Sequence, residues 1–176
     1  MKKIIIYYSF TGNNESLYRE LQRRLNCEAF SILEPKRRTW LTILLDMLFD
    51  RRPRIELFPV DLRKYDMVIL MSPVWNAHIA NPMKSFIDKE KDHLKEYAFL
   101  TVCGGRQGQK EKLLQELKLL TGKTPAAVAE LEIGKLPVEE GKQPKNGSMY
   151  RIQSQDPDTW APEISGFLKA LESVEV

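Results

Sequence analysis

The sequence has little of what metal centres, disulfide frameworks and membrane spans require. It holds two cysteines and two histidines among 176 residues, too few for a disulfide framework or a metal cluster. No apolar run reaches the roughly 18 residues that a transmembrane helix needs. The formal net charge is only +3, which does not by itself indicate nucleic-acid binding. We therefore expect no metal, no nucleic-acid partner and no transmembrane segment.

The N-terminus combines a basic start with an apolar run, MKKIIIYYSF, as a secretion signal would. However, the run is too short and no small-residue cleavage site follows it. Its β-branched residues favour a strand instead. We interpret the stretch as the first strand of a cytoplasmic protein.

Short apolar runs alternate along the chain with segments of helical periodicity. The runs at 4–8 and 67–71 are continuously apolar, which is typical of strands buried on both faces. Asn81 and Pro82 are expected to be the N-cap and the first position of a helix, and Gly122 is expected to end another. Strands are expected at 4–8, 28–33, 67–71, 98–103 and 127–133, and helices around 17–25, 81–87, 113–120 and 164–171.

Strands that alternate with helices predict an α/β fold, a doubly wound five-stranded parallel sheet with helices on both faces. We expect residues 1–176 to form a single domain. The stretch from Lys135 to Pro157 is rich in Pro, Gly, Lys and Gln and is expected to be a long surface connection.

In such sheets, ligands bind beyond the carboxyl ends of the strands. The segments to inspect are therefore SFTGNNES after the first strand, SPVWNAHIANP after the third and CGGRQG after the fourth. The first segment leads into a helix N-terminus, which attracts phosphate. It contains hydroxyls and amides but no Lys or Arg, so it suits a phosphate held by dipoles and hydrogen bonds. The alternative is a turn whose polar residues only cap the helix.

Several other occupants of this fold lack their required residues here. The loop has no Gly-Lys-Ser/Thr ending, as an ATP-type phosphate loop requires, and the chain has no G-x-G-x-x-G fingerprint. A phosphate-receiving signalling domain needs acidic residues where Tyr8–Ser9 and Ser72–Pro73 stand. A cysteine phosphatase needs Cys-x5-Arg, and neither Cys27 nor Cys103 is followed by it.

The remaining pattern resembles the flavodoxin family. The family's phosphate loop, Ser/Thr-x-Thr-Gly-Asn-Thr, is matched by SFTGNN at 9–14 except at Asn14, and Ser72-Pro73 with Trp75 matches the family's next loop. The resemblance implies FMN, with its phosphate on the first loop and its isoalloxazine ring between the other two. The cofactor-binding residues that it implies are Ser9, Phe10, Thr11, Gly12, Asn13, Asn14, Pro73, Val74, Trp75, Asn76, Ala77, Cys103, Gly104, Gly105 and Gly108.

Trp75 also fits a flavin site on physical grounds. An exposed indole on a loop is costly unless a flat ring stacks on it; the alternative is a tryptophan folded back onto the core. His78 and Arg106 can be read either as groups that meet a substrate or cofactor or as solvated side chains. No residue is assigned a catalytic role, because the chemistry of such proteins belongs to the flavin.

Two features distinguish the chain from an electron carrier of the family it resembles. Such carriers are typically acidic, whereas this chain is net positive. Carriers also tend to have glycine after the second-loop aromatic, where Asn76 and Ala77 stand here. We expect an FMN-dependent oxidoreductase that passes electrons from NAD(P)H or a redox partner protein to a small acceptor such as a quinone. The alternatives are a flavodoxin acting only in electron transfer and a flavin-free interaction domain.

The segment PKRRTWLTILLDMLFDRRPR, at 35–54, is unusual because only two of the ten residues at 40–49 are polar. Its six basic residues against two aspartates give it a local charge of +4. One interpretation is a well-buried helix with solvated basic ends. Others are a homodimer contact through residues 40–49, a lid over the flavin, and attachment to an anionic membrane.

Overall fold

The computed structural model, which describes residues 1–36, 38–136, 151–152 and 156–174, contains one five-stranded sheet in the order β2-β1-β3-β6-β7. All neighbouring strands of this sheet are parallel. The predicted α/β fold class is thereby confirmed. The strands are β1 Lys3–Tyr7, β2 Glu28–Ser31, β3 Met67–Met71, β6 Glu96–Cys103 and β7 Val128–Glu132.

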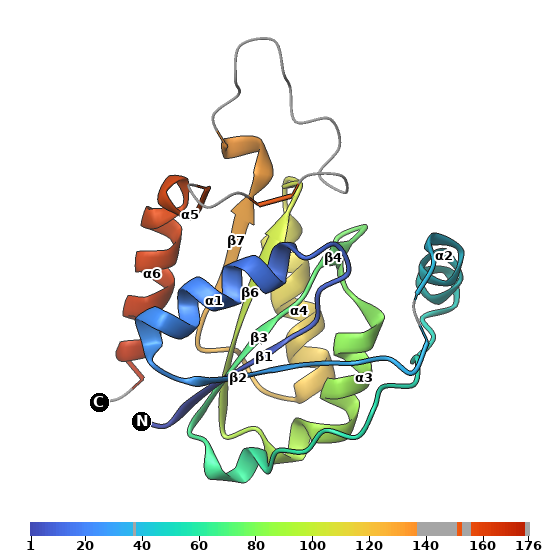
Figure 1. Cartoon of the computed structure of the whole chain (residues 1–176), viewed down its shortest axis with the longest axis horizontal. Helices are drawn as coiled ribbons and strands as arrows, with labels where there is room; N and C mark the ends of the chain where they lie inside the picture. The colour runs from blue at the N-terminus through green and yellow to red at the C-terminus, as the bar shows by residue number, and fades with distance from the viewer. Residues whose placement is uncertain (37, 137–150, 153–155, 175–176) are drawn as a thin grey trace.

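Helices cover both faces of the sheet (Figure 1). On one face, α1 (Asn13–Leu25) and α6 (Ala161–Glu172) pack against one apolar cluster. On the other, α3 (Asn81–Glu90) and α4 (Gln109–Thr121) pack against a second one. Alternate residues of β3 belong to the two clusters, and all five are buried, which explains the continuous apolar run. Gly122 ends α4 as predicted.

Two local features differ from the sequence expectation. Asn81 is the first residue of α3 rather than its N-cap, which is Ala80. The Asn81 amide instead donates to the backbone oxygens of Asp46 and Arg51, at 3.2 and 2.9 Å. The other feature is an unpredicted antiparallel hairpin of β4 (Val74–Trp75) and β5 (His78–Ile79). The surface connection predicted for 135–157 lies mostly outside the described residues.

The interpretation of residues 40–49 as a buried helix is wrong. A helix does form, α2 (Trp40–Phe49), but the only residue buried in it is Asp46. Figure 1 shows α2 standing apart from the layers of the sheet and its covering helices. The high apolar content of the segment therefore does not serve the core.

Candidate functional site

Three loops meet at the carboxyl ends of the adjacent strands β1, β3 and β6. The first loop joins β1 to α1 and contains the predicted phosphate-binding residues. The Ser9 hydroxyl oxygen accepts hydrogen bonds from the backbone N–H groups of Gly12 (3.1 Å) and Glu15 (3.3 Å). Gly12 has φ +93°, a left-handed conformation that glycine adopts without strain. Ser9 thus fixes the shape of the loop and keeps its own O–H available to donate.

A residue that the sequence analysis did not identify, Arg151, contacts this loop. Arg151 donates from its guanidinium to the carbonyl oxygen of Thr11, and the next backbone N–H, of Ile152, donates to the side chain of Asn13 at 3.0 Å. A Cβ placed on Gly12 would stand 3.4 Å from the Arg151 guanidinium. The loop has no basic residue of its own, but the fold brings one to it. The sequence alone does not predict this pairing, because Thr11 and Arg151 are 140 residues apart.

The second loop is the β4–β5 hairpin that carries the predicted Pro73–Ala77 stretch. Asn76 and Ala77 both have positive φ, 51° and 63°, as the two central residues of a type I′ hairpin turn require. Glycine, the residue expected at such positions, is absent from both. The Asn76 side-chain oxygen accepts a hydrogen bond from Arg106 of the third loop at 2.9 Å, which ties the two loops together.

Trp75 connects the second loop to the first. Its indole is half-buried rather than exposed, and it packs against the core cluster below it. Tyr8 and Phe10 meet it edge to face, each with ring centroids 6.3 Å from that of Trp75. Such arrangements are favourable between aromatic rings. Trp75 therefore fits each interpretation in part. Its ring packs on the core, and it also borders the first loop.

The third loop follows β6 and contains Cys103, Gly104, Gly105 and Gly108. A Cβ on Gly104 or Gly108 would meet nothing within 4 Å, so the backbone there is open to close approach. Gly105 differs, because it has φ +76° and its Cβ would lie 2.7 Å from a Glu132 carboxylate oxygen. Burial raises the pKa of the Cys103 thiol to about 11, so this thiol is protonated at neutral pH and a poor nucleophile.

Polar groups behind the hairpin are held by α3 and α4. The Glu116 carboxylate of α4 accepts from the backbone N–H of Ile79 at 2.8 Å and lies 3.2 Å from Nδ1 of the exposed His78. The buried Lys84 ammonium pairs with the same carboxylate at 2.7 Å. The hairpin is thus fixed from both the third loop and the helix layer.

A second set of polar side chains, Tyr8, Glu34 and Arg38, lies near Trp75. The Tyr8 hydroxyl donates to Glu34 at 2.8 Å, and burial together with the Glu34 charge raises the pKa of Tyr8 above its usual value. Arg38 lies with its guanidinium 5.9 Å from the centre of the Trp75 ring, within cation–π range. Burial acts to lower the pKa of Arg38, but hydrogen bonds to Glu34 and Asp46 outweigh it and raise that pKa.

One buried polar atom at the first loop has no partner. Asn14 is 2% exposed, and its side-chain oxygen Oδ1 is the only buried side-chain N or O atom without a hydrogen bond in the described residues. A buried unsatisfied amide is unusual in a folded protein, and an amide can present either its oxygen or its nitrogen to a ligand. The residues present therefore fit a polar ligand at the start of α1.

Comparison with known proteins finds the same fold in several solved structures. No protein-family model and no curated protein matches the sequence. A flavoprotein from Lactobacillus acidophilus, solved in complex with FMN, matches with a TM-score of 0.64 and 22% identity over 73% of this chain and 92% of that one. A WrbA-like flavodoxin from Agrobacterium tumefaciens matches with a TM-score of 0.55 and 15% identity over 99% and 98%. An FMN-bound flavodoxin from Fusobacterium nucleatum matches at 0.50 and 11%, over 96% and 98%.

The sheet order defines an α/β protein whose three loops lie at the switch point of its sheet, the position where folds of this class bind ligands. Within that class, the chain has the flavodoxin-like fold. In the described part of the chain, no helix has the length and apolar content needed to cross a bilayer. Across those same residues, no group of His, Cys, Asp and Glu side chains is arranged to hold a metal ion.

Proposed function

We propose that the protein binds FMN on the three loops and works as an oxidoreductase. Electrons would pass from NAD(P)H or a redox partner protein to a small acceptor such as a quinone. The observation that carries the proposal is the convergence of the loops. Phe10 and Trp75 join the first loop to the second, and Asn76 and Arg106 join the second to the third.

When bound, FMN supplies the hydride and electron transfer. The chain's own residues would hold and orient it. The first turn of α1, with the hydroxyls of Ser9 and Thr11, would bind the phosphate, because a helix N-terminus attracts an anion. Trp75 and the backbone around Gly104 and Gly108 would border the ring. The FMN complexes of two proteins with the same fold, from Lactobacillus acidophilus and Fusobacterium nucleatum, support this assignment.

The net positive charge of the chain favours the enzyme over a carrier of the acidic kind. The test is oxidation of NADH and NADPH by the purified, FMN-loaded protein alone, with a soluble benzoquinone as acceptor. We expect turnover that requires both FMN and the acceptor. If the loaded protein oxidises neither nucleotide but is reduced by a separate reductase, it is an electron carrier.

A variant of the first loop tests whether that loop binds the FMN phosphate. Thr11→Leu removes a hydroxyl and adds bulk where the phosphate is proposed to lie, so FMN retention should be lost. Thr124→Leu, at an exposed threonine elsewhere in the chain, is the matched control and should retain FMN. Equal FMN affinity in both variants would show that the phosphate assignment is wrong.

A further inference from the structure

Helix α2 has the reverse of the usual amphipathic orientation. Its one buried residue is the carboxylate Asp46, which is 7% exposed, whereas Trp40, Leu48 and Phe49 are 72%, 68% and 69% exposed. At 3.6 residues per turn, Trp40, Leu41, Leu44 and Leu48 fall within roughly 100° of the helix circumference, opposite Asp46. We call the five exposed apolar side chains the α2 surface: Trp40, Leu41, Leu44, Leu48 and Phe49.

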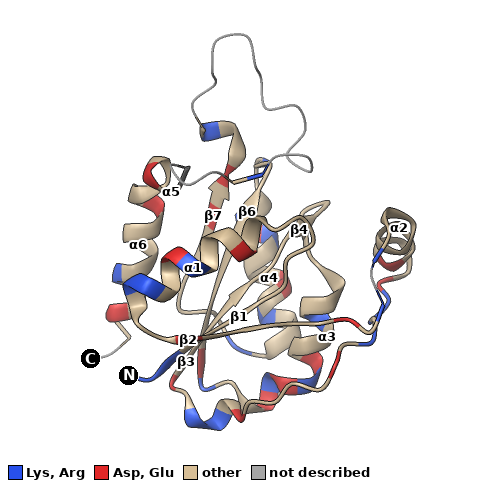
Figure 2. Cartoon of the chain, in the orientation of Figure 1, with Lys and Arg blue, Asp and Glu red and all other residues tan. Residues whose placement is uncertain are grey.

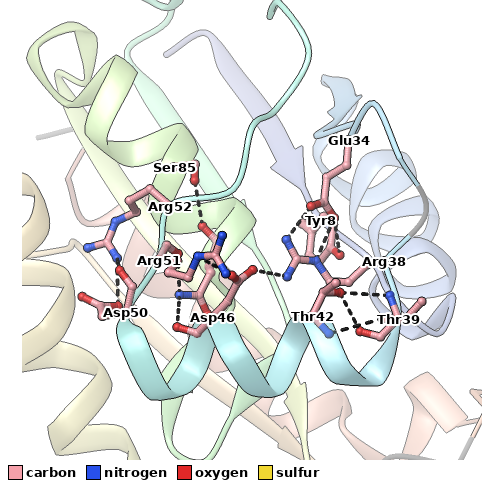
Figure 3. A network of polar contacts seen from close by, with 11 residues as sticks. Tyr8, Glu34, Arg38, Thr39, Thr42, Asp46, Asp50, Arg51, Arg52 and Ser85 are labelled. Carbon is pink, nitrogen blue, oxygen red and sulfur yellow. Dashed lines mark hydrogen bonds and ion pairs between the residues drawn. The ribbon is translucent and has the colours of Figure 1, made fainter.

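A polar network fixes the helix in this orientation (Figure 3). Arg38 is clamped between Asp46 (2.5 Å) and Glu34, to which it donates two hydrogen bonds at 2.5 and 3.1 Å. The Arg38 side chain is buried in these ion pairs. Because the inner side of α2 is already satisfied by polar partners, rotating the helix to bury its apolar side would leave buried charges unpaired.

The C-terminal end of α2 is tied to α3 in the same way. Lys84 pairs with Asp50 at 3.0 Å and Arg52 pairs with Asp88 at 2.7 Å. Hydrogen bonds to these cations lower the pKa of Asp50 against the opposing effect of burial. Both ends of the helix are therefore anchored. These contacts keep the α2 surface exposed.

Basic residues lie on the segments that flank α2 in the chain, and several of them line a cavity on the side of the helix that carries Asp46. A cavity of about 560 Å³ beside the helix is lined by Lys36, Arg38, Arg51, Arg52 and Arg54, with Glu34 and Asp46 as its acidic residues. Arg38 and Arg52 are paired as above, whereas Lys36 and Arg54 are exposed and form no ion pair with the described residues. Figure 2 shows α2 itself largely free of charge, with charged residues on the segments that lead to and from it.

We propose that the α2 surface docks onto the interface of an anionic lipid bilayer. A convex helix with an apolar side and basic flanks can lie in the interface plane without a complementary groove. Tryptophan is favoured at the level of the headgroups, and exposed Lys and Arg beside the helix attract anionic lipids. The apolar side chains would enter the acyl boundary while Lys36 and Arg54 face the headgroups.

Charge decides against a second copy of the chain as the occupant. Two α2 helices paired antiparallel about a two-fold axis would bring the Lys36 end of one against the Arg51 and Arg54 end of the other. Like charges in contact are unfavourable. An anionic surface meets the same groups favourably at both ends of the helix.

The test is co-sedimentation of the whole chain with vesicles of phosphatidylcholine, alone or mixed with phosphatidylglycerol. We expect binding to the mixed vesicles, weaker binding to phosphatidylcholine alone, and a decrease with added salt. The double variant Leu48→Glu with Phe49→Glu should bind at least about tenfold more weakly. Leu119→Glu is the matched control, because Leu119 is 86% exposed on α4, and it should bind as the parent does.

Circular dichroism checks that the variants keep their fold, and sedimentation velocity shows whether the protein is a monomer or a dimer. Lys36→Glu with Arg54→Glu should abolish the preference for anionic lipid while the far-ultraviolet spectrum stays unchanged. No binding to the mixed vesicles at low salt would overturn the proposal. So would a vesicle-independent dimer that the Leu48→Glu, Phe49→Glu variant dissociates, because the α2 surface would then be a contact between copies. None of these outcomes depends on FMN.

Discussion

At the residue scale, Arg151 gives the 9–14 loop, the proposed phosphate site, a cation that the loop's own sequence lacks. The guanidinium has five donors, and the contact with the Thr11 carbonyl occupies only part of that capacity. A phosphate bound at the start of α1 would lie within reach of the remaining donors, since Arg151 already borders Gly12. Arg151 is exposed, so solvent screens the interaction and its contribution is modest.

The prediction for Arg151 compares two ligands that differ only in the phosphate. Arg151→Gln should weaken FMN binding by about fivefold and leave riboflavin binding unchanged. Arg63→Gln, which removes an exposed cation just before β3, should alter neither. Both affinities are measured by flavin fluorescence titration. An equal loss for FMN and riboflavin would mean that Arg151 supports the loop rather than the phosphate.

A second residue-scale prediction concerns the third loop. Gly105→Ala places a Cβ 2.7 Å from Glu132 at a positive φ, and the strain should lower the free energy of unfolding by about 1–2 kcal/mol. Gly104→Ala has no such contact and should change it little. Urea denaturation of the two variants measures the difference. Equal stability of both would contradict the strain expected for an alanine at position 105.

Loop residues that are consecutive in the sequence could be predicted from it. Residues that folding brings to the loop from a distant segment could not. The 9–14 loop could be located because an apolar run stops and a helix starts around it. Arg151 could not, because its partner loop is distant in sequence. Asn81 was misplaced because an Asn before a Pro has the pattern of an N-cap, yet its amide is used to hold α2.

At the element scale, the two features that escaped prediction both rest on side-chain context. The β4 and β5 strands have two residues each, too few for a period-2 pattern to show, and their turn lacks glycine. Helix α2 could be predicted from its composition, but its orientation could not. An apolar helix usually turns that side to the core, whereas ion pairs such as Arg38–Asp46 and Lys84–Asp50 fix the opposite orientation here.

The polar anchor of α2 makes a prediction of its own. Asp46→Asn keeps the shape but removes the charge that Arg38 pairs with, which should weaken the docking of α2 by about 1.5–3 kcal/mol. Because α2 stands outside the two core clusters, the loss should be local. Hydrogen exchange of α2 amides should accelerate while that of α4 amides hardly changes. Uniform acceleration throughout the protein would show that α2 unfolds only with the whole domain.

At the scale of the whole molecule, the architecture was predictable because buried parallel strands leave a strong signal. The central strand β3 is apolar on both faces, and the expected five strands appear in the order that a doubly wound sheet requires. The same topology places the loops after β1, β3 and β6 at one edge, since parallel strands end on the same side. The position proposed for the site thus follows from the fold, whereas the proposed ligand rests on the chemistry of the loops.

The central claim is that this edge of the molecule holds FMN, and the most direct measurement is a titration of the purified, flavin-free protein with FMN. Visible absorption and tryptophan fluorescence are recorded together. We predict flavin bands that shift on binding with saturable stoichiometry, and quenching of Trp75 emission that Trp75→Phe reduces. Flavin bands that remain those of free FMN, with no quenching at any concentration, would contradict the account. The first loop would then serve only to begin α1.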